Sequence, residues 1–205
     1  MAIVKNGING PFTGKIGAAV GSTWRGVNVI RSRPKPPTHF SVKQLANQMK
    51  MKVAQEFLKH LVEPVRIGFR DELIVQTAYN SAISYHKKFA LAGEYPHLTL
   101  NIAAVKISQG LLWMPNEMTM QSDDERLVIT WSGDLEDNAR NDDQLLLVLW
   151  DKVKKLALYS LQGYRSAGQF SWEPGINPAG AHVWAAFIRQ DRSMQSESTY
   201  LGAVL

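Results

Sequence analysis

The sequence predicts an α+β protein: a glycine-rich β element and a two-helix hairpin, followed by an antiparallel β-sandwich of the immunoglobulin or fibronectin type III kind. Apolar residues recur at three- and four-residue spacing between residues 41 and 93, which is typical of helices. From residue 98 they alternate or form short runs, which is typical of strands. The chain has 205 residues, 45% of them hydrophobic, so it can bury a sizeable core. We expect two domains, a basic β arm with the helical hairpin at 1–97 and the sandwich at 98–205.

The N-terminal region is punctuated by glycine. Asn-Gly pairs at positions 6–7 and 9–10 favour turns, because both residue types tolerate positive φ. Between Gly10 and Arg33, glycines separate short segments of β-branched residues, so this stretch predicts a twisted hairpin or a pair of loosely paired strands. The sequence Arg-Pro-Lys-Pro-Pro at 33–37 then predicts a stiff, extended connector.

Two amphipathic helices are expected after this connector. Ser41 and Gln44 have the spacing of a capping box, so the first helix should begin at Ser41, and Pro64 should stop or kink it. The second helix should open at Asp71 and continue to Phe89, with cations in its last turn. Because the connection between the helices is short, we expect them to pack antiparallel.

The second half of the chain predicts about seven short strands, separated by loops rich in Gly, Pro, Asn and Asp. The expected strands are 98–102, 127–131, 144–150, 156–161, 170–172, 182–189 and 198–205. Large aromatic residues fill sandwich cores, so Trp131, Trp150, Trp172 and Trp184 are expected to be buried.

Positive charge is concentrated in the first half of the chain. Residues 1–110 hold 15 Lys and Arg against 5 Asp and Glu, whereas residues 111–205 hold 8 against 13. This separation suggests an anionic partner for the basic half, or head-to-tail association of a positive surface with a negative one. The alternative is that solvated faces simply differ in charge. The candidate residues for contact with a partner or with nucleic acid are Lys15, Trp24, Arg25, Arg31, Arg33 and Lys35.

No residue pattern indicates catalysis, a cofactor or a metal. The chain has no cysteine, which excludes disulfides, thiolate metal sites and cysteine nucleophiles. Gly10–Lys15 is reminiscent of a phosphate-binding loop, but only three residues separate its glycines and Ile16 follows the lysine. Its amides could still cradle an isolated phosphate. The five histidines have no metal-ligand spacing. We therefore expect no enzyme activity, no cofactor and no metal.

The acidic stretch Asp134–Asn138 has some features of a calcium loop, but it lacks the required glycine, at Ala139, and the closing glutamate, at Leu145. Together with Asp142 and Asp143 it predicts a solvated loop between strands. No apolar run of signal-peptide or membrane-spanning length occurs. The expected location is the cytoplasm, with incorporation into a virion or other particle as one setting, and without membrane insertion.

Several motifs of the sequence are distinctive. They are Gly-Pro-Phe-Thr-Gly-Lys-Ile-Gly at 10–17, Trp-Arg-Gly at 24–26, Val-Ile-Arg-Ser-Arg-Pro at 29–34 and Tyr-Arg-Ser-Ala-Gly at 164–168. Together they resemble the pattern of an uncharacterised bacterial family of about this length, a domain of unknown function. The resemblance covers nearly the whole chain and implies no function.

Two hypotheses for function follow. The first is a non-enzymatic structural or interaction protein, an assembly component that contacts another protein or itself through the basic N-terminal arm. The alternative is a nucleic-acid-binding protein without sequence preference, because no DNA- or RNA-recognition motif accompanies the cations. A hydrolase or ligand-binding domain on the sandwich loops is a third reading, which rests only on the versatility of such folds.

Overall fold

The computed structural model describes residues 2–4, 7, 10–70, 77–123 and 125–204. The chain divides into two compact units, an N-terminal unit (Met1–Ser41) and a C-terminal unit (Val42–Leu205). The sequence favoured the ranges 1–97 and 98–205 instead. In the structure the helices after Ser41 share a hydrophobic core with the sheet that follows them, so they belong with it.

The N-terminal unit is, in its described residues, an antiparallel sheet with the strand order β1-β2-β3-β4. Its strands are β1 (Ile3–Val4), β2 (Phe12–Ile16), β3 (Ala19–Trp24) and β4 (Val27–Ser32). A two-residue turn joins β3 to β4, and both of its residues have positive φ, 48° at Arg25 and 82° at Gly26. This is the conformation of a type I′ hairpin, whose twist matches that of the strands. The expected hairpin is thus part of a larger sheet.

Three helices begin the described part of the C-terminal unit, α1 (Val42–Leu58), α2 (Val62–Gly68) and α3 (Ala78–Phe89). The first starts directly after Ser41, as predicted. It ends before Pro64, however, which lies in the first turn of α2, where a proline costs no helical hydrogen bond. The side chain of Thr77 caps α3 by accepting a hydrogen bond from the amide of Asn80, at 3.3 Å. The start predicted at Asp71 lies outside the described residues.

Two further sheets follow, with the strand orders β11-β8-β7 and β10-β9-β12-β13. Their strands are β7 (Met118–Asp123), β8 (Arg126–Trp131), β9 (Gln144–Asp151), β10 (Leu156–Tyr164), β11 (Gln169–Trp172), β12 (His182–Ile188) and β13 (Thr199–Ala203). The expected strand at 98–102 is shorter: only Thr99–Leu100 (β6) pairs, with Leu91–Ala92 (β5), before the 3₁₀ turn Ile102–Ala104. A second 3₁₀ turn, Arg165–Ala167, precedes β11. The mixed α+β class is therefore confirmed.

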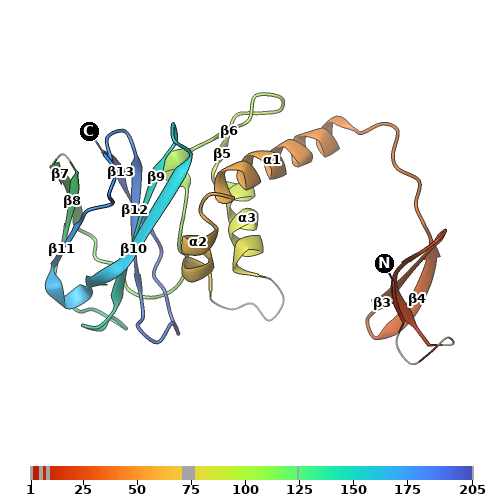
Figure 1. Ribbon diagram of the computed structural model, residues 1–205, viewed down its shortest axis with the longest axis horizontal. Coiled ribbons are helices and arrows are strands. Elements are labelled where there is room, and N and C mark those ends of the chain that lie inside the picture. The colour runs from red at the N-terminus through yellow and green to blue at the C-terminus, as the bar shows by residue number, and fades with distance from the viewer. Residues whose placement is uncertain (1, 5–6, 8–9, 71–76, 124, 205) are drawn as a thin grey trace. The chain divides into compact units, whose positions relative to one another are not determined.

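The four-stranded sheet is the middle layer of the C-terminal unit (Figure 1). Alternate residues of β9, such as Leu145 and Leu147, pack with β8 of the three-stranded sheet. The intervening residues, such as Leu146 and Trp150, pack with the helices. Every residue of β9 from Leu145 to Asp151 is buried, which explains why this strand reads as a continuous apolar run. Among the four tryptophans expected in the core, Trp131, Trp150 and Trp184 are buried and Trp172 is half-buried.

Candidate interaction surface

Strand pairing brings three of the six candidate residues onto one face of the N-terminal sheet. Lys15 pairs with Val20, and Val20 pairs with Arg31, so these side chains form a row across three strands. Trp24 pairs with Val27 on the same face, because alternate residues of a strand point the same way. We define the basic face as Lys15, Val20, Trp24, Val27, Val29 and Arg31.

The basic face is exposed, including its apolar part. Trp24 is 69% exposed and Val27 is 63% exposed. The opposite face also carries an exposed apolar side chain, Ile30, at 67%. Among the described residues of the N-terminal unit, only Gly21 is buried. This sheet therefore presents apolar surface without enclosing a core of its own, a property of surfaces that contact another molecule.

Gly21 is required by the close approach of Phe12. A Cβ at position 21 would lie 2.2 Å from the carbonyl oxygen of Phe12 and 2.6 Å from its ring. The absent side chain thus lets the Phe12 ring lie across β3, on the face opposite the basic face. This contact adds side-chain packing to the backbone pairing of β2 with β3.

The remaining three candidate residues lie beside the basic face or beyond it. Arg25 occupies the tip of the β3–β4 hairpin, where its guanidinium carbon lies 5.8 Å from the centre of the Trp24 ring, within cation–π range. Arg33 and Lys35 follow β4 in the exposed connector. The backbone amide of Arg33 donates to the carbonyl of Ala18, at 2.7 Å, and so continues the pairing one residue past the strand.

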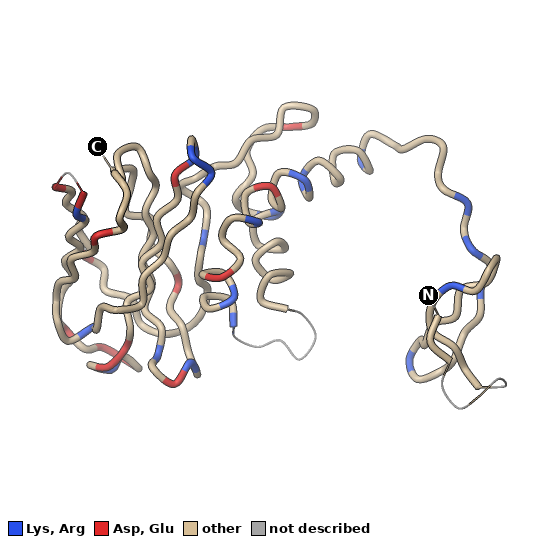
Figure 2. Tube along the Cα trace, in the orientation of Figure 1, with Lys and Arg blue, Asp and Glu red and all other residues tan. Residues whose placement is uncertain are grey.

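The sequence of the N-terminal unit contains no acid. Its six cations are Lys5, Lys15, Arg25, Arg31, Arg33 and Lys35, and all 18 Asp and Glu residues of the chain lie after Ser41. Figure 2 shows Lys and Arg along this unit without Asp or Glu. The positive charge of the basic face is therefore not neutralised within its own unit, and it would attract an anionic surface.

Within the described residues, no three His, Cys, Asp or Glu side chains gather closely enough to hold a metal ion. No helix in the described ranges has the length and apolar character needed to cross a bilayer.

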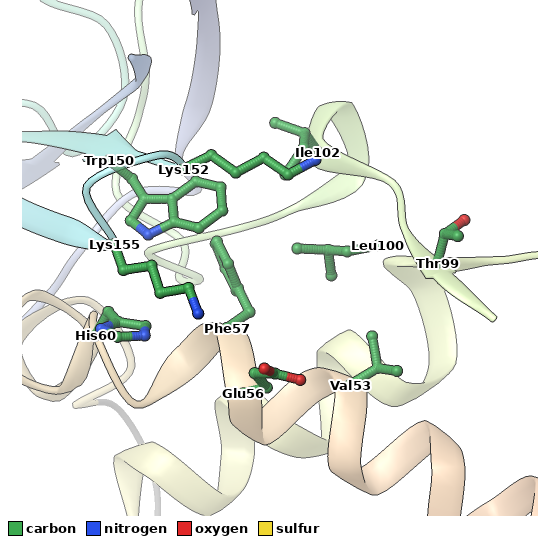
Figure 3. Close-up of a pocket in the computed structure, with 10 residues that line it drawn as sticks. All are labelled: Val53, Glu56, Phe57, His60, Thr99, Leu100, Ile102, Trp150, Lys152 and Lys155. Carbon is green, nitrogen blue, oxygen red and sulfur yellow. The ribbon is translucent and has the colours of Figure 1, made fainter. Parts of the chain in front are cut away.

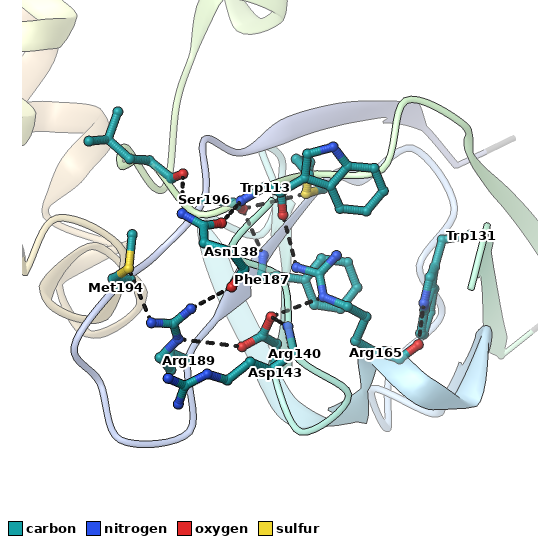
Figure 4. Close-up of polar contacts among 12 residues, drawn as sticks. Trp113, Trp131, Asn138, Arg140, Asp143, Arg165, Phe187, Arg189, Met194 and Ser196 are labelled. Carbon is teal, nitrogen blue, oxygen red and sulfur yellow. Dashed lines mark hydrogen bonds and ion pairs between the residues drawn. The ribbon is translucent and has the colours of Figure 1, made fainter. Parts of the chain in front are cut away.

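A buried polar network lies in the C-terminal unit (Figure 4). The side chains of Arg165 and Asp143 are both fully buried, and Nε of Arg165 donates to Oδ2 of Asp143 at 3.0 Å. Nη2 of Arg165 donates to the carbonyl of Trp113 at 2.9 Å, and its guanidinium carbon lies 3.9 Å from the centre of the Phe187 ring. The pKa of Arg165 is lowered from its ordinary value, because the effect of burial is larger than the opposing effect of the Asp143 charge. The ion pair connects the residue just before β9, Asp143, to the 3₁₀ turn that follows β10, Arg165–Ala167.

The same network fixes the loop between β8 and β9. The amide of Trp113 donates to Oδ1 of Asn138 at 2.8 Å, and Nδ2 of Asn138 donates to the carbonyl of Leu111 at 3.0 Å. The amide of Arg140 donates to Oδ2 of Asp143 at 2.8 Å. The prediction of a solvated loop was therefore wrong for Asp143, because its partner Arg165 lies 22 positions away in the sequence and no local pattern reveals it.

Two of the distinctive sequence motifs, at 24–26 and 164–168, have defined positions in the structure. Trp24, Arg25 and Gly26 form the hairpin tip beside the basic face, and Arg165 is the centre of the buried network. A family model, described as a family of unknown function (DUF6266), matches residues 11–202. The chain belongs to this family. The match extends over both units, so the N-terminal sheet and the C-terminal unit are parts of one DUF6266 sequence. No curated protein and no solved structure matches the chain.

Proposed function

We propose that this DUF6266 protein is a non-enzymatic interaction protein, which assembles with a protein partner or with itself through the basic face. One observation carries the proposal: Trp24 and Val27 are exposed beside Lys15 and Arg31, in a sheet that buries almost none of its described residues. Burying one large apolar side chain contributes about 1.5–3 kcal/mol. Covering Trp24 and Val27 would therefore contribute about 3–6 kcal/mol to association. A virion or tail-like particle assembled in the cytoplasm is one setting for such a contact.

Light scattering over a protein concentration series tests self-association, and a pull-down from a lysate of the native host tests a foreign partner. We expect the double variant Trp24→Ser with Val27→Thr to lose the complex. The matched control is Ile30→Thr, because Ile30 is equally exposed on the opposite face. A strict monomer at high concentration that also recovers no partner contradicts the proposal. Equal losses from the two variants contradict the assignment to the basic face.

The second candidate function is binding of single-stranded nucleic acid without sequence preference. It is favoured by one feature of the same face: an exposed indole, Trp24, lies next to Arg25 in a unit without acids. Aromatic side chains stack on bases and cations contact phosphates, so both parts of such a site are present. A protein partner explains the exposed valines better, since valine gains little from a nucleic acid.

Salt dependence separates the two functions. Binding of a fluorescent oligonucleotide should weaken steeply with salt, with a log–log slope of about −0.7 per phosphate neutralised. Lys15→Gln with Arg31→Gln should reduce the slope by about 1.4, whereas the matched pair Lys50→Gln, on α1, with Lys59→Gln, directly after α1, should leave it unchanged. Absence of binding at low ionic strength rejects this function.

We also infer that residues 118–203 form a sandwich of the fibronectin type III kind. Its seven strands divide into sheets of three and four that share one hydrophobic core. The chain passes from one sheet to the other between β8 and β9, and again between β10 and β11 and between β11 and β12, which agrees with Greek-key connections. Domains of this architecture are common in interaction proteins, and this supports the proposed function by analogy only.

A further inference from the structure

A pocket with about 390 Å³ of space lies within the C-terminal unit, bounded by α1, the segment from Thr99 to Ile102 and the β9–β10 turn (Figure 3). This volume is in the range of small-molecule sites. Most of the wall is apolar, and it is formed by Val53, Phe57, Leu100, Ile102 and Trp150. The pocket belongs to the C-terminal unit, whereas the proposed function rests on the N-terminal unit.

Trp150 gives this apolar wall one polar group. Its side chain packs edge-on against the ring of Phe57, with 4.9 Å between the ring centres, and only 7% of it is exposed. The indole nitrogen Nε1 is buried and donates to no acceptor in the described structure. Figure 3 shows this nitrogen turned toward Lys155. Buried indole N–H groups usually have an acceptor, so a ligand oxygen would complete the hydrogen bonding here.

Two lysines from one turn flank the pocket. Lys152 and Lys155 both line it, and their side chains extend from the β9–β10 turn along two of its sides (Figure 3). Neither forms an ion pair with any residue that the structure describes. Lys154, from the same turn, differs: its ammonium lies 3.3 Å from Asp151 and also donates to the carbonyl of Asn177. Of the three lysines in this turn, Lys154 is therefore the one that pairs with a described acid, and it does not line the pocket.

The backbone of Lys155 adds an independent observation. Its φ is 52°, in the left-handed region, where glycine or asparagine is the favoured residue of a hairpin. A lysine at this position costs stability that a glycine would not, and its side chain is one of the two that line the pocket. The remaining charged group at the rim is Glu56, which opposes one lysine charge.

We propose that this pocket binds an amphipathic monocarboxylate, a small acid with an apolar body. The apolar body would contact Phe57, Leu100 and Trp150, and the carboxylate would lie beside Lys155 and accept a hydrogen bond from Nε1 of Trp150, with Lys152 adding positive charge on the other side of the pocket. A carboxylate suits this site because it supplies both the missing acceptor and the counter-charge for the lysines. An alcohol with the same chain supplies only the acceptor.

The test uses decanoate, below the concentration at which it forms micelles, and decanol as the uncharged control. Each is titrated into the full-length ¹⁵N-labelled protein while the six tryptophan indole N–H signals are followed by NMR, with the Trp150 signal assigned from a Trp150→Phe variant. We expect decanoate to shift the Trp150 signal downfield in a saturable manner, and decanol to bind at least about tenfold more weakly.

Variants in the turn and on α1 complete the experiment. Lys155→Gly should weaken decanoate binding by about tenfold or more without loss of folding, because glycine suits the positive φ. Lys154→Gln is the matched control and should bind normally. Glu56→Gln should tighten binding, since it removes the opposing charge. No shift of the Trp150 signal at millimolar decanoate overturns the proposal, and so does equal affinity for decanol or unchanged affinity in Lys155→Gly.

Discussion

Replacing Asp143 with asparagine should destabilise the C-terminal unit far more than loss of a surface charge. Asp143→Asn leaves the shape of the side chain nearly unchanged but removes the charge that balances Arg165. Both side chains are fully buried, so the Arg165 guanidinium cannot turn to water. Arg189 lies nearby, with its Nε 4.0 Å from Oδ1 of Asp143, and it adds a second cation to the uncompensated charge.

The size of this effect follows from the burial of the pair. Removing one partner of a buried ion pair costs about 3–5 kcal/mol, because the other charge stays desolvated. With a urea dependence of about 2 kcal/mol per molar, the unfolding midpoint should fall by about 1.5–2.5 M. Circular dichroism at 222 nm is the appropriate signal, since the helices α1–α3 belong to this unit, whereas the fluorescence of Trp113 and Trp131 would also respond to local changes in the network.

Two comparisons make the result decisive. Arg126→Met removes the exposed ion pair with Glu173 and should cost less than about 1 kcal/mol. The double variant Asp143→Leu with Arg165→Met removes both buried charges, and it should be more stable than Asp143→Asn alone. A decrease of less than about 1 kcal/mol in the free energy of unfolding of Asp143→Asn would refute the reasoning. So would a double variant whose decrease equals the sum of the decreases measured for Asp143→Leu and Arg165→Met alone.

Three further outcomes are expected. Gly21→Ala should unfold the N-terminal sheet, because its Cβ would meet the Phe12 carbonyl at 2.2 Å, and the strand signals of residues 12–32 should disappear from an NMR spectrum while those of the C-terminal unit persist. The unfolding temperature should fall as the pH drops below 6.5. Burial lowers the pKa of His86 and of His182 in the folded state, so the unfolded chain binds more protons in this range. An unfolding temperature that is unchanged between pH 7.5 and 5.5 contradicts this. Lys155→Gly should raise the free energy of unfolding by about 0.5–1 kcal/mol, measured by urea titration, whereas a loss of stability would show that the left-handed backbone at this position is not strained.

Much of the fold was predictable from local sequence patterns, and the elements that were missed were missed for physical reasons. The alternation of Leu127, Ile129 and Trp131 predicted a strand with one buried face, and β8 has its buried residues at these positions. Strand β7 was missed, because its apolar residues are methionines among polar neighbours and give no β-branched signal. Helix α2 was missed because it is only seven residues long and contains a proline.

The candidate surface was predictable in composition but not in geometry. The sequence identified Lys15, Trp24 and Arg31 from charge and residue type, but the face that they share depends on the lengths of two turns, which set the strand register. The pocket could not be predicted at all. Its wall combines residues from Val53 to Lys155, and only the packing of α1 on the sheet brings them together.

Strand β9 has one more consequence, which concerns the choice between alternative pairings. Because it is apolar on both faces, a shift by one residue would exchange Leu145, Leu147 and Leu149 for Leu146, Val148 and Trp150, and both faces would stay apolar. The ends of the strand must therefore distinguish the native register. Asp143 is held by Arg165 just before β9, and Asp151 accepts hydrogen bonds from the amides of Val153 and Lys154 at its end, at 2.8 and 2.9 Å. The two carboxylates thus favour one pairing register for an apolar strand. Replacing both should yield a mixture of registers and also lower the free energy of unfolding.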